Sequence, residues 1–202
     1  MVIEENGKRI MTDPGSWTVD EQKKEKNIDL IIITHEHRDH IHIESLKIIL
    51  KNNPEVIIIT NNGVGKLLDQ EGIKYEIIEN KIPKEFLGVE LEAHNCRHEE
   101  IYGEIGQVQN TAYFINERLF YPGDAFYNPN KPVDILALPV AGPWANVKNA
   151  TQYALQVNPK VCFPVHDGML KSFGASHEII KMVLEKSGVP FKSFEENKEE
   201  EF

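Results

Sequence analysis

Cysteine is scarce in this sequence, which has 202 residues but only two cysteines, Cys96 and Cys162. They lie far apart and neither belongs to a C-x-x-C pair, which excludes a disulfide framework and a zinc ribbon. Cys162 lies in an apolar run and is predicted to be a small core residue. Reduced thiols of this kind are typical of a cytoplasmic protein.

Long apolar runs and an excess of basic residues are also missing. No apolar run approaches the roughly 20 residues that a membrane-spanning helix needs, and the N-terminus lacks the basic-then-apolar pattern of a secretion signal. The formal net charge is −10, which disfavours a sequence-independent grip on nucleic acid, because such a grip depends on clustered Lys and Arg. We therefore expect a soluble cytoplasmic protein without a membrane or nucleic-acid partner.

Short apolar runs alternate with helix-like patterns along most of the chain. Continuous Val, Leu and Ile runs at residues 30–33 and 56–59 predict strands that are covered on both faces. Helical patterns follow at 43–51, 144–157 and 176–187. This alternation is typical of layered α/β proteins.

The middle of the chain has a different pattern. Residues 88–94, 111–115 and 118–123 read as antiparallel strands, and a tight turn at 116–118 joins the last two. The length suits one domain of residues 1–202. We predict two mixed β/α halves that pack together with their helices outside.

Residues 35–40 form the motif H-x-H-x-D-H directly behind a predicted buried strand. Side chains two apart on an extended backbone point the same way, so His35 and His37 can converge on one ion. Asp39 and His40 fall where the chain turns into the next helix, and can address a second ion. Imidazole and carboxylate ligands without thiolate suit Zn, Fe or Mn. A His-rich surface loop is the alternative that this segment alone leaves open.

Suitable ligands recur at the carboxyl ends of later predicted strands. His98, Asp124 and His166 each follow an apolar strand pattern. In open α/β sheets, binding sites form outside the carboxyl ends of the strands. Together with the motif, these residues amount to five imidazoles and two carboxylates, enough for two metal coordination sets with one carboxylate free to bridge.

The order of these segments resembles the metallo-β-lactamase superfamily, and within it the branch of small metal-dependent hydrolases that includes the ascorbate-phosphate lactonase. The motif together with a later His, a Gly-Asp pair and a final His is a highly specific combination. The resemblance implies an α/β (α+β) fold, a four-layer αββα sandwich. The matching segments are RIMTDPG, DLIIITHEHRDH, HNCRH before NTAYFI, LFYPGDAF, VDILALPVAGPW and VCFPVHDG.

The resemblance also implies a role for each candidate ligand. It predicts two divalent ions, with zinc as the first choice and manganese or iron as alternatives. The seven predicted ligands are His35, His37 and His98 for the first ion, Asp39, His40 and His166 for the second, and Asp124 as the bridge between them.

Two aspartates outside this set also match the family. Asp29 matches a carboxylate that orients a ligand histidine from behind. Asp13 in TDPG matches a turn near the site, and a turn-forming Asp-Pro-Gly without a catalytic role is at least as good an interpretation. Within the set, Asp39 is predicted to be catalytic as a proton carrier, a role that a neighbouring His could also fill.

Other candidate residues have simpler interpretations. His94 is the rival of His98 as a ligand, and we prefer His98 because it lies shortly before the next strand. Trp144 is predicted either to anchor packing or to line a substrate wall. The residues expected to have only structural or surface roles are His42, His177, Glu36 and Arg38.

The two ends of the chain depart from the family pattern. About a dozen residues precede Asp13, so the first strand is expected to be shortened or absent, which would open one edge of the sheet. The acidic end, residues 195–202, is predicted to be a solvated tail.

The predicted function is hydrolysis of a small ester, lactone or phosphoester by a hydroxide held between two metal ions. The enzyme alternatives are a phosphodiesterase or nuclease of the ribonuclease Z type, which the acidity disfavours, and a thioesterase related to glyoxalase II. An oxygen- or nitric-oxide-reducing diiron protein is a third, although its family has a carboxylate where this chain has His37. A metal-binding protein without turnover is the non-enzyme alternative. The expected partner is a small-molecule substrate, and a homo-oligomer is left open.

Overall fold

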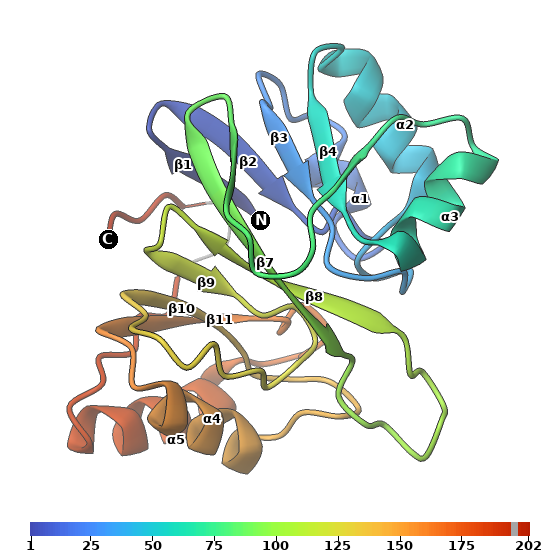
Figure 1. Ribbon diagram of the computed structural model, residues 1–202. Helices are drawn as coiled ribbons and strands as arrows, with labels where there is room; N and C mark the ends of the chain where they lie inside the picture. The colour runs from blue at the N-terminus through green and yellow to red at the C-terminus, as the bar shows by residue number, and fades with distance from the viewer. Residues whose placement is uncertain (195–197) are drawn as a thin grey trace.

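The computed structural model describes residues 1–194 and 198–202. In this part of the chain, two β-sheets pack face to face and helices cover the outer face of each, so the order of layers is αββα (Figure 1). The predicted fold class is confirmed. None of the helices in the described ranges combines the length and the hydropathy that a membrane crossing needs.

The first sheet is built from the N-terminal part of the chain, in the strand order β1-β2-β3-β4-β5. β1 and β2 are antiparallel, whereas β2 to β5 run parallel. Its strands are β1 (Val2–Glu5), β2 (Lys8–Thr12), β3 (Leu30–Ile32), β4 (Ile57–Thr60) and β5 (Glu76–Ile77), and the helices of this half are α1 (Val19–Gln22), α2 (Ile43–Asn52) and α3 (Asn62–Gln70).

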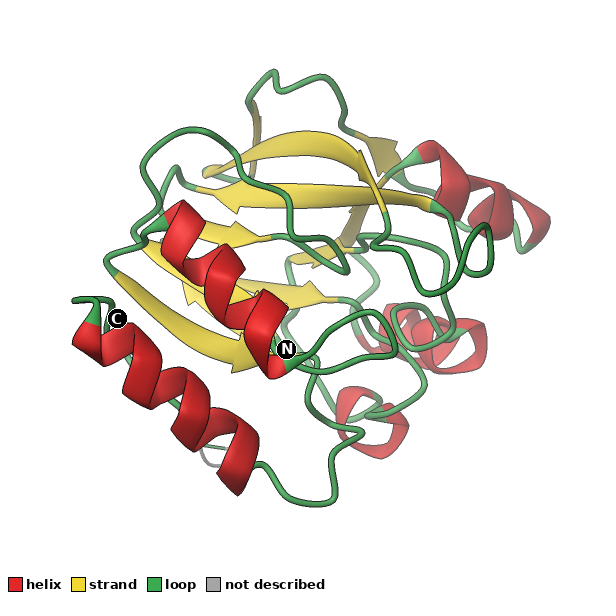
Figure 2. Ribbon diagram, turned by 90° about the horizontal axis from the view of Figure 1, so that it is seen from below, coloured by secondary structure: helices red, strands yellow, loops and turns green. Residues whose placement is uncertain are grey.

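The second sheet has the order β11-β10-β9-β8-β7-β6. The strands β9 to β11 are parallel to one another, and the strands β6 to β9 pair antiparallel. Figure 2 shows two helices lying across the outer face of this sheet. The elements are β6 (Lys84–Phe86), β7 (Val89–Arg97), β8 (Gln109–Ile115), β9 (Leu119–Tyr121), β10 (Ile135–Pro139), β11 (Val161–Val165), α4 (Val147–Val157) and α5 (Gly174–Lys186).

Alternate residues of each central strand face different layers. Leu30 and Ile32 of β3 lie in the core between the sheets, whereas Ile31 packs into the cluster formed with α2 and α3. In β8, Tyr113 lies between the sheets and Phe114 packs toward α4 and α5. Both faces of these strands are therefore buried, as the continuous apolar runs predict.

Two local predictions can be compared with the structure. Asn116 and Glu117 both have positive φ, 50° and 51°, which is the backbone of a tight hairpin turn between β8 and β9, as predicted. The helix predicted from residue 144 begins later, at Val147, because Asn146 caps it by accepting the N–H groups of Lys148 and Asn149.

The N-terminal strand is short but present. β1 pairs with β2 from Val2 opposite Met11 to Glu5 opposite Lys8. Asn6 and Gly7, with φ of 52° and 70°, form the turn between them. Of the two predicted alternatives, a shortened or an absent strand, the structure excludes the second, and β1 forms the edge of the first sheet.

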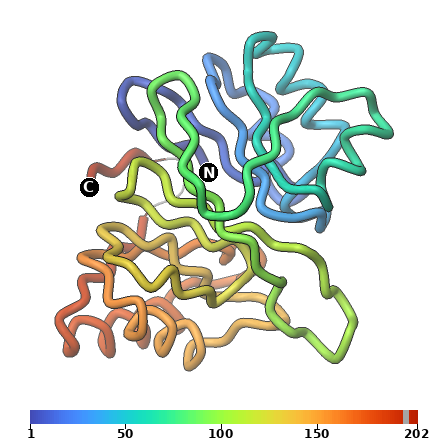
Figure 3. Tube along the Cα trace, viewed as in Figure 1, coloured from blue at the N-terminus to red at the C-terminus, as the bar shows by residue number. Residues whose placement is uncertain are grey.

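The C-terminal segment is not simply solvated. The rings of Phe194 and Phe202 lie 5.1 and 5.4 Å from that of Phe163 and pack against the core between the sheets. The carbonyl of Phe202 accepts a hydrogen bond from the Arg118 guanidinium. Figure 3 shows this end of the chain returning toward the N-terminal hairpin. The predicted solvated tail is therefore wrong for Phe202, while residues 195–197 lie outside the described part of the chain.

Candidate metal centre

The H-x-H-x-D-H motif occupies a loop that the fold holds from two sides. Past the end of β3, the carbonyl of Thr34 accepts the N–H of Thr111 in β8, at 2.9 Å, so the loop starts where the two sheets meet. The TDPG turn packs on its other side. A Cβ on Gly15 would lie 1.7 Å from the carbonyl oxygen of Asp39, so only glycine permits this approach.

The structure brings the seven predicted ligands together in two groups. Within each group, one potential ligand atom from every residue lies within 4.8 Å of the others. Four of these residues are almost fully buried, with His37, Asp39 and His166 more exposed. The first group is His35, His37 and His98, and the second is Asp39, His40, Asp124 and His166.

The Asp124 carboxylate lies between the groups. Its Oδ2 is 3.3 Å from Nε2 of His98, in the first group, and 3.1 Å from Nε2 of His166, in the second. Its Oδ1 is 3.1 Å from Nε2 of His40. One carboxylate therefore faces both groups, which is the position that a bridging ligand needs.

Several polar atoms that face this centre make no hydrogen bond of normal geometry with any residue that the structure describes, although Nε2 of His40 and Oδ1 of Asp124 are 3.1 Å apart. They are Nε2 of His35, Nε2 of His40 and Oδ1 of Asp124, and all three are buried. Buried polar atoms are normally satisfied, so a converging set of unsatisfied donors and acceptors needs an explanation. Divalent metal ions fit this set, because imidazole nitrogen and carboxylate oxygen are the ligands that zinc, iron and manganese accept.

The opposite ring nitrogen, Nδ1, is held by the protein in four of the five histidines. A histidine whose Nδ1 donates a hydrogen bond is fixed in the tautomer that presents Nε2 to an ion. The acceptors are Thr34 Oγ1 for His35 at 3.0 Å, Asp13 Oδ2 for His40 at 2.8 Å, the Glu99 carbonyl for His98 at 2.6 Å and the Ala141 carbonyl for His166 at 2.6 Å.

Asp13 is the carboxylate that orients a candidate ligand. It follows β2 and has a φ of 43°. Its Oδ2 accepts hydrogen bonds from His40, from the Thr34 hydroxyl at 2.8 Å and from the Tyr121 hydroxyl at 2.6 Å. Because Thr34 also contacts His35, this one carboxylate supports a ligand of each group. The sequence signal was TDPG at the end of a strand, which predicts proximity to the site but not this contact.

The orienting role predicted for Asp29 is wrong. Asp29 precedes β3, and the candidate ligands follow the other end of that strand. Its carboxylate accepts the Lys8 ammonium at 3.1 Å and the N–H of Arg9 at 2.9 Å, and these two interactions lower its pKa, the Arg9 N–H most. Asp29 therefore joins β2 to β3 at the far end of the sheet.

Burial and charge set different protonation states within the centre. Burial, and then the neighbouring His40, lower the pKa of His35 well below its usual value, so its imidazole is neutral. Burial would also lower the pKa of His40, but the charges of Asp124 and Asp13 raise it well above its usual value. Burial would lower the pKa of His166, but its hydrogen bonds to Asp124 and Asp39 favour the charged form and raise the pKa to about 10. The carboxylates thus attract positive charge to this point, which divalent ions would supply.

The other histidines lie apart from the centre. His94 points toward Phe114 and Phe120, and its Nε2 is 2.6 Å from Oε1 of Glu92. His42 caps α2 by accepting the N–H of Ser45. His177 is half-buried rather than a plain surface residue, because it contacts Asp167 at 3.0 Å and stacks on Phe173.

Trp144 lies at the centre itself. Its indole N–H donates to Oδ2 of Asp124 at 3.1 Å, and its ring centroid lies 5.7 Å from those of His98 and His166. The sequence left its role open between packing and a substrate wall, and did not show this hydrogen bond. Cys162 is fully buried, as predicted, and Arg38 is exposed. Glu36 lies near Asn61 and Gly63 at the start of α3.

Comparison with known proteins identifies this architecture. A family described as the beta-lactamase superfamily domain matches residues 1–166. The chain belongs to the metallo-β-lactamase superfamily. Its relatives place it in the branch of small metal-dependent hydrolases, as the motifs predict.

Two relatives illustrate the branch. A protein of Mycobacterium tuberculosis is 29% identical over 167 residues, which cover 80% of this chain and 77% of that protein. A protein of Caldivirga maquilingensis, named a metal-dependent hydrolase, is 28% identical over 81% of this chain and 76% of its own length.

Solved structures show the same superfamily fold. A protein of Parabacteroides distasonis, described as a metal-dependent hydrolase, superposes with a TM-score of 0.77 at 23% identity, over 95% of this chain and 87% of that one. The diiron β-hydroxylase CmlA of Streptomyces venezuelae has a TM-score of 0.72 at 14% identity, over 96% of this chain and 50% of its own. At 23% and 14% sequence identity, these similarities show a shared fold and nothing about activity.

Proposed function

We propose that this protein is a hydrolase that uses two divalent metal ions to cleave a small ester, lactone or phosphoester. The observation that carries the proposal is the Asp124 carboxylate, whose oxygens lie between a group of three histidines and a group that contains Asp39, His40 and His166. Family membership and the names of the relatives support it. Zinc is the first candidate, and manganese and iron suit the same ligands.

Each group of side chains has a distinct part in this proposal. Bound metal ions would supply a hydroxide at neutral pH and stabilise negative charge on the reacting oxygen. His35, His37 and His98 would hold one ion, and Asp39, His40 and His166 the other, with Asp124 shared. The Nδ1 hydrogen bonds keep four of these imidazoles in the orientation that presents Nε2.

Asp39 is the residue that we propose to carry a proton. Its side chain is 24% exposed, against 3% for Asp124, so it is the carboxylate of the centre that solvent and substrate can reach. Its Oδ2 lies 3.5 Å from Nε2 of His166. Burial would raise the pKa of Asp39, but the contact with His166 favours the ionised carboxylate, and the pKa is lowered overall. An ionised, reachable carboxylate can take up a proton at the reacting atoms.

The substrate and the compartment are proposed from charge and cysteine content. A net charge of −10 disfavours the ribonuclease Z alternative, because a polyanion would be repelled. We therefore favour a small molecule as the substrate. The two cysteines are unpaired, which fits the reducing cytoplasm.

The test is a hydrolysis screen on protein purified without chelator and then loaded with Zn or Mn. Lactone, ester and phosphodiester probes should be cleaved faster than in metal-containing buffer, and Asp124→Ala should remove this turnover. Asp20→Ala, which changes an exposed carboxylate on α1, is the matched control and should behave as the unchanged protein. A fully metal-loaded protein that cleaves none of the three probe classes would contradict the proposal.

A further inference from the structure

The indole of Trp144 touches the centre at its shared residue. Its N–H donates to Oδ2 of Asp124, the same oxygen that faces His98 and His166. The ring lies 5.7 Å, centroid to centroid, from both of these imidazoles. Trp144 therefore contacts the shared carboxylate and one candidate ligand from each group.

The loop between β10 and α4 is shaped to hold this ring. Gly142 has a φ of 151°, and a Cβ there would lie 3.0 Å from the indole nitrogen. The ring of Phe126 lies 5.2 Å away on another side, and Asn149 donates to the Trp144 carbonyl at 3.4 Å. Trp144 is only 6% exposed. In this packing the single polar atom of the indole points at Asp124.

The same loop also holds a candidate ligand. The Ala141 carbonyl accepts the Nδ1–H of His166, so residues 141–144 contact both His166 and Asp124. His166 has a φ of 60°, an uncommon backbone for a residue with a side chain. A strained ligand and a constrained loop next to each other are consistent with a site that is ordered before an ion binds.

The carboxylate of Asp124 needs such a constraint. Its backbone N–H is fixed by the side chain of Asn110 at 3.1 Å, but this does not set the rotation of the carboxylate. The other close contacts of that carboxylate are with imidazoles, which are themselves candidate metal ligands. The indole N–H is a hydrogen-bond donor that does not bind metal, so it can fix the rotation of the Asp124 carboxylate whether or not ions are present.

We propose that Trp144 is a positioning residue of the metal centre, whose indole N–H fixes the Asp124 carboxylate with Oδ1 toward His40 and Oδ2 toward His98 and His166. The inference rests on the proposed function, because it assigns Asp124 as the shared ligand. It goes further by naming a residue outside the ligand set on which metal affinity depends.

The test uses a protein in which Trp144 is the sole tryptophan. The sequence has two, and Trp17 is 63% exposed, so Trp17→Phe serves as the parent and should retain the metal affinity of the unchanged chain. Two further changes at position 144 remove the N–H. Trp144→Phe keeps an aromatic ring, and replacement of Trp144 by benzothienylalanine keeps the shape of the indole with sulfur in place of N–H.

Zinc affinity is measured by competition with a chromophoric chelator, and folding by thermal unfolding of the metal-free proteins. Loss of an orienting partner typically weakens metal binding about 10- to 100-fold. We expect a loss of at least about 10-fold for both replacements, with the metal-free fold retained. In the metal-free parent, the indole vibrational bands should report a hydrogen-bonded N–H. The two replacements at position 144 lack this N–H and should lack its signal.

Each outcome separates the explanations. Affinity within about twofold of the parent for the benzothienyl protein would overturn the proposal, even if Trp144→Phe binds weakly, because shape would then explain the loss. A parent that binds two ions but cleaves no probe would contradict the hydrolase function and leave the positioning role to be decided by affinity. A parent that takes up no zinc would overturn both.

Discussion

His94 and His98 lie four residues apart on and just after β7, and both are buried beside a carboxylate, with 1% and 3% of their surfaces exposed. His94 is 2.6 Å from Glu92, whose other oxygen is 2.6 Å from the Lys131 ammonium. His98 faces Asp124 and lies among His35 and His37. The two rings therefore differ in their neighbours: His94 lies beside a carboxylate that is paired with a lysine, and His98 lies beside a carboxylate and two other imidazoles.

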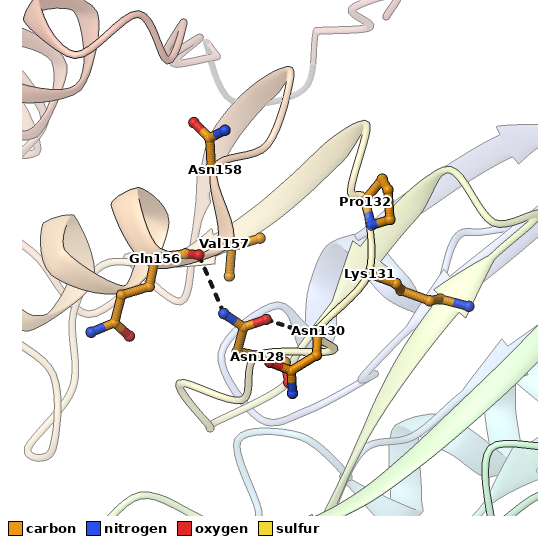
Figure 4. A pocket seen from close by; sticks show the side chains of 7 residues that line it. All are labelled: Asn128, Asn130, Lys131, Pro132, Gln156, Val157 and Asn158. Carbon is orange, nitrogen blue, oxygen red and sulfur yellow. Dashed lines mark hydrogen bonds between the residues drawn. The ribbon is translucent and has the colours of Figure 1, made fainter.

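His94 belongs to no group of three or more candidate ligands in the described part of the chain, although both of its ring nitrogens, like Nε2 of His35 and His40, lack a hydrogen-bond partner there. Glu92 is neutralised by Lys131, and the rings of Phe114 and Phe120 flank the imidazole. Lys131, partly exposed, also lines a pocket between residues 128–132 and the end of α4 (Figure 4). Burial lowers the pKa of His94 more than Glu92 raises it. A buried histidine with a carboxylate, even one with unsatisfied ring nitrogens, is therefore not enough to indicate a metal site; the convergence of three or more ligand atoms is the better sign.

The largest effect is expected from replacing His98, the histidine that lies in the metal centre. His98→Ala removes one of three imidazoles in the first group, so metal content should fall by about one ion per chain. Loss of a residue that only orients a ligand typically costs about 10- to 100-fold, so loss of the ligand itself should lower the rate of hydrolysis at least about 100-fold. Elemental analysis and the probe assay measure both. Unchanged metal content in a folded His98→Ala protein would remove His98 from the site.

A smaller loss is expected from Asp13→Asn, which keeps the size of the side chain but removes the charge that orients His40. Metal affinity should weaken about 10- to 100-fold, as measured by chelator competition. Asp29→Asn is the matched control, because Asp29 lies beyond the other end of β3 and should leave affinity unchanged. Equal losses in the two variants would show that Asp13 acts through general stability.

His94→Ala should leave metal binding intact and affect stability instead. It leaves Glu92 without one partner in a buried site, which typically costs about 1 to 3 kcal/mol in the free energy of unfolding. Urea unfolding measures that cost, and elemental analysis checks the metal content. A loss of bound metal equal to that of His98→Ala would abolish the distinction between the two histidines.

The smallest effect concerns Cys96, which lies on β7 between His94, on the same strand, and His98, just after it. Burial raises the pKa of its thiol to about 11, and that of Cys162 to about 12. The reactive thiolate is therefore scarce at pH 8 and increases only as the pH approaches these values. An aromatic disulfide reagent should label the native protein slowly at pH 8 and both thiols rapidly in guanidinium. Rapid labelling of the native protein would show that this strand opens.

Local patterns predict the strands, the outer helices and a cluster of ligands at strand ends, whereas the four-layer order and the grouping of the seven candidate ligands come from the family resemblance. Apolar runs identify strands buried on both faces, and ligands at strand ends meet at one edge of the sandwich. The wrong role for Asp29 comes from the resemblance, since Asp29 precedes β3 and the candidate ligands follow it. The contact of Asp13 with His40 could not be predicted, because it depends on β2 lying beside β3. The Trp144 contact depends on the backbone of Gly142, and the packing of Phe202 on Phe163 joins segments whose pairing no local pattern encodes.

The central claim is that this centre holds two ions, and metal content per chain tests it most directly. Protein purified without chelator, and again after incubation with Zn and Mn, should contain about two ions per chain, and His98→Ala should contain about one. His94→Ala should match the unchanged protein. A value that stays near zero after loading would contradict the account, because the converging imidazoles and carboxylates would then have to be satisfied without metal.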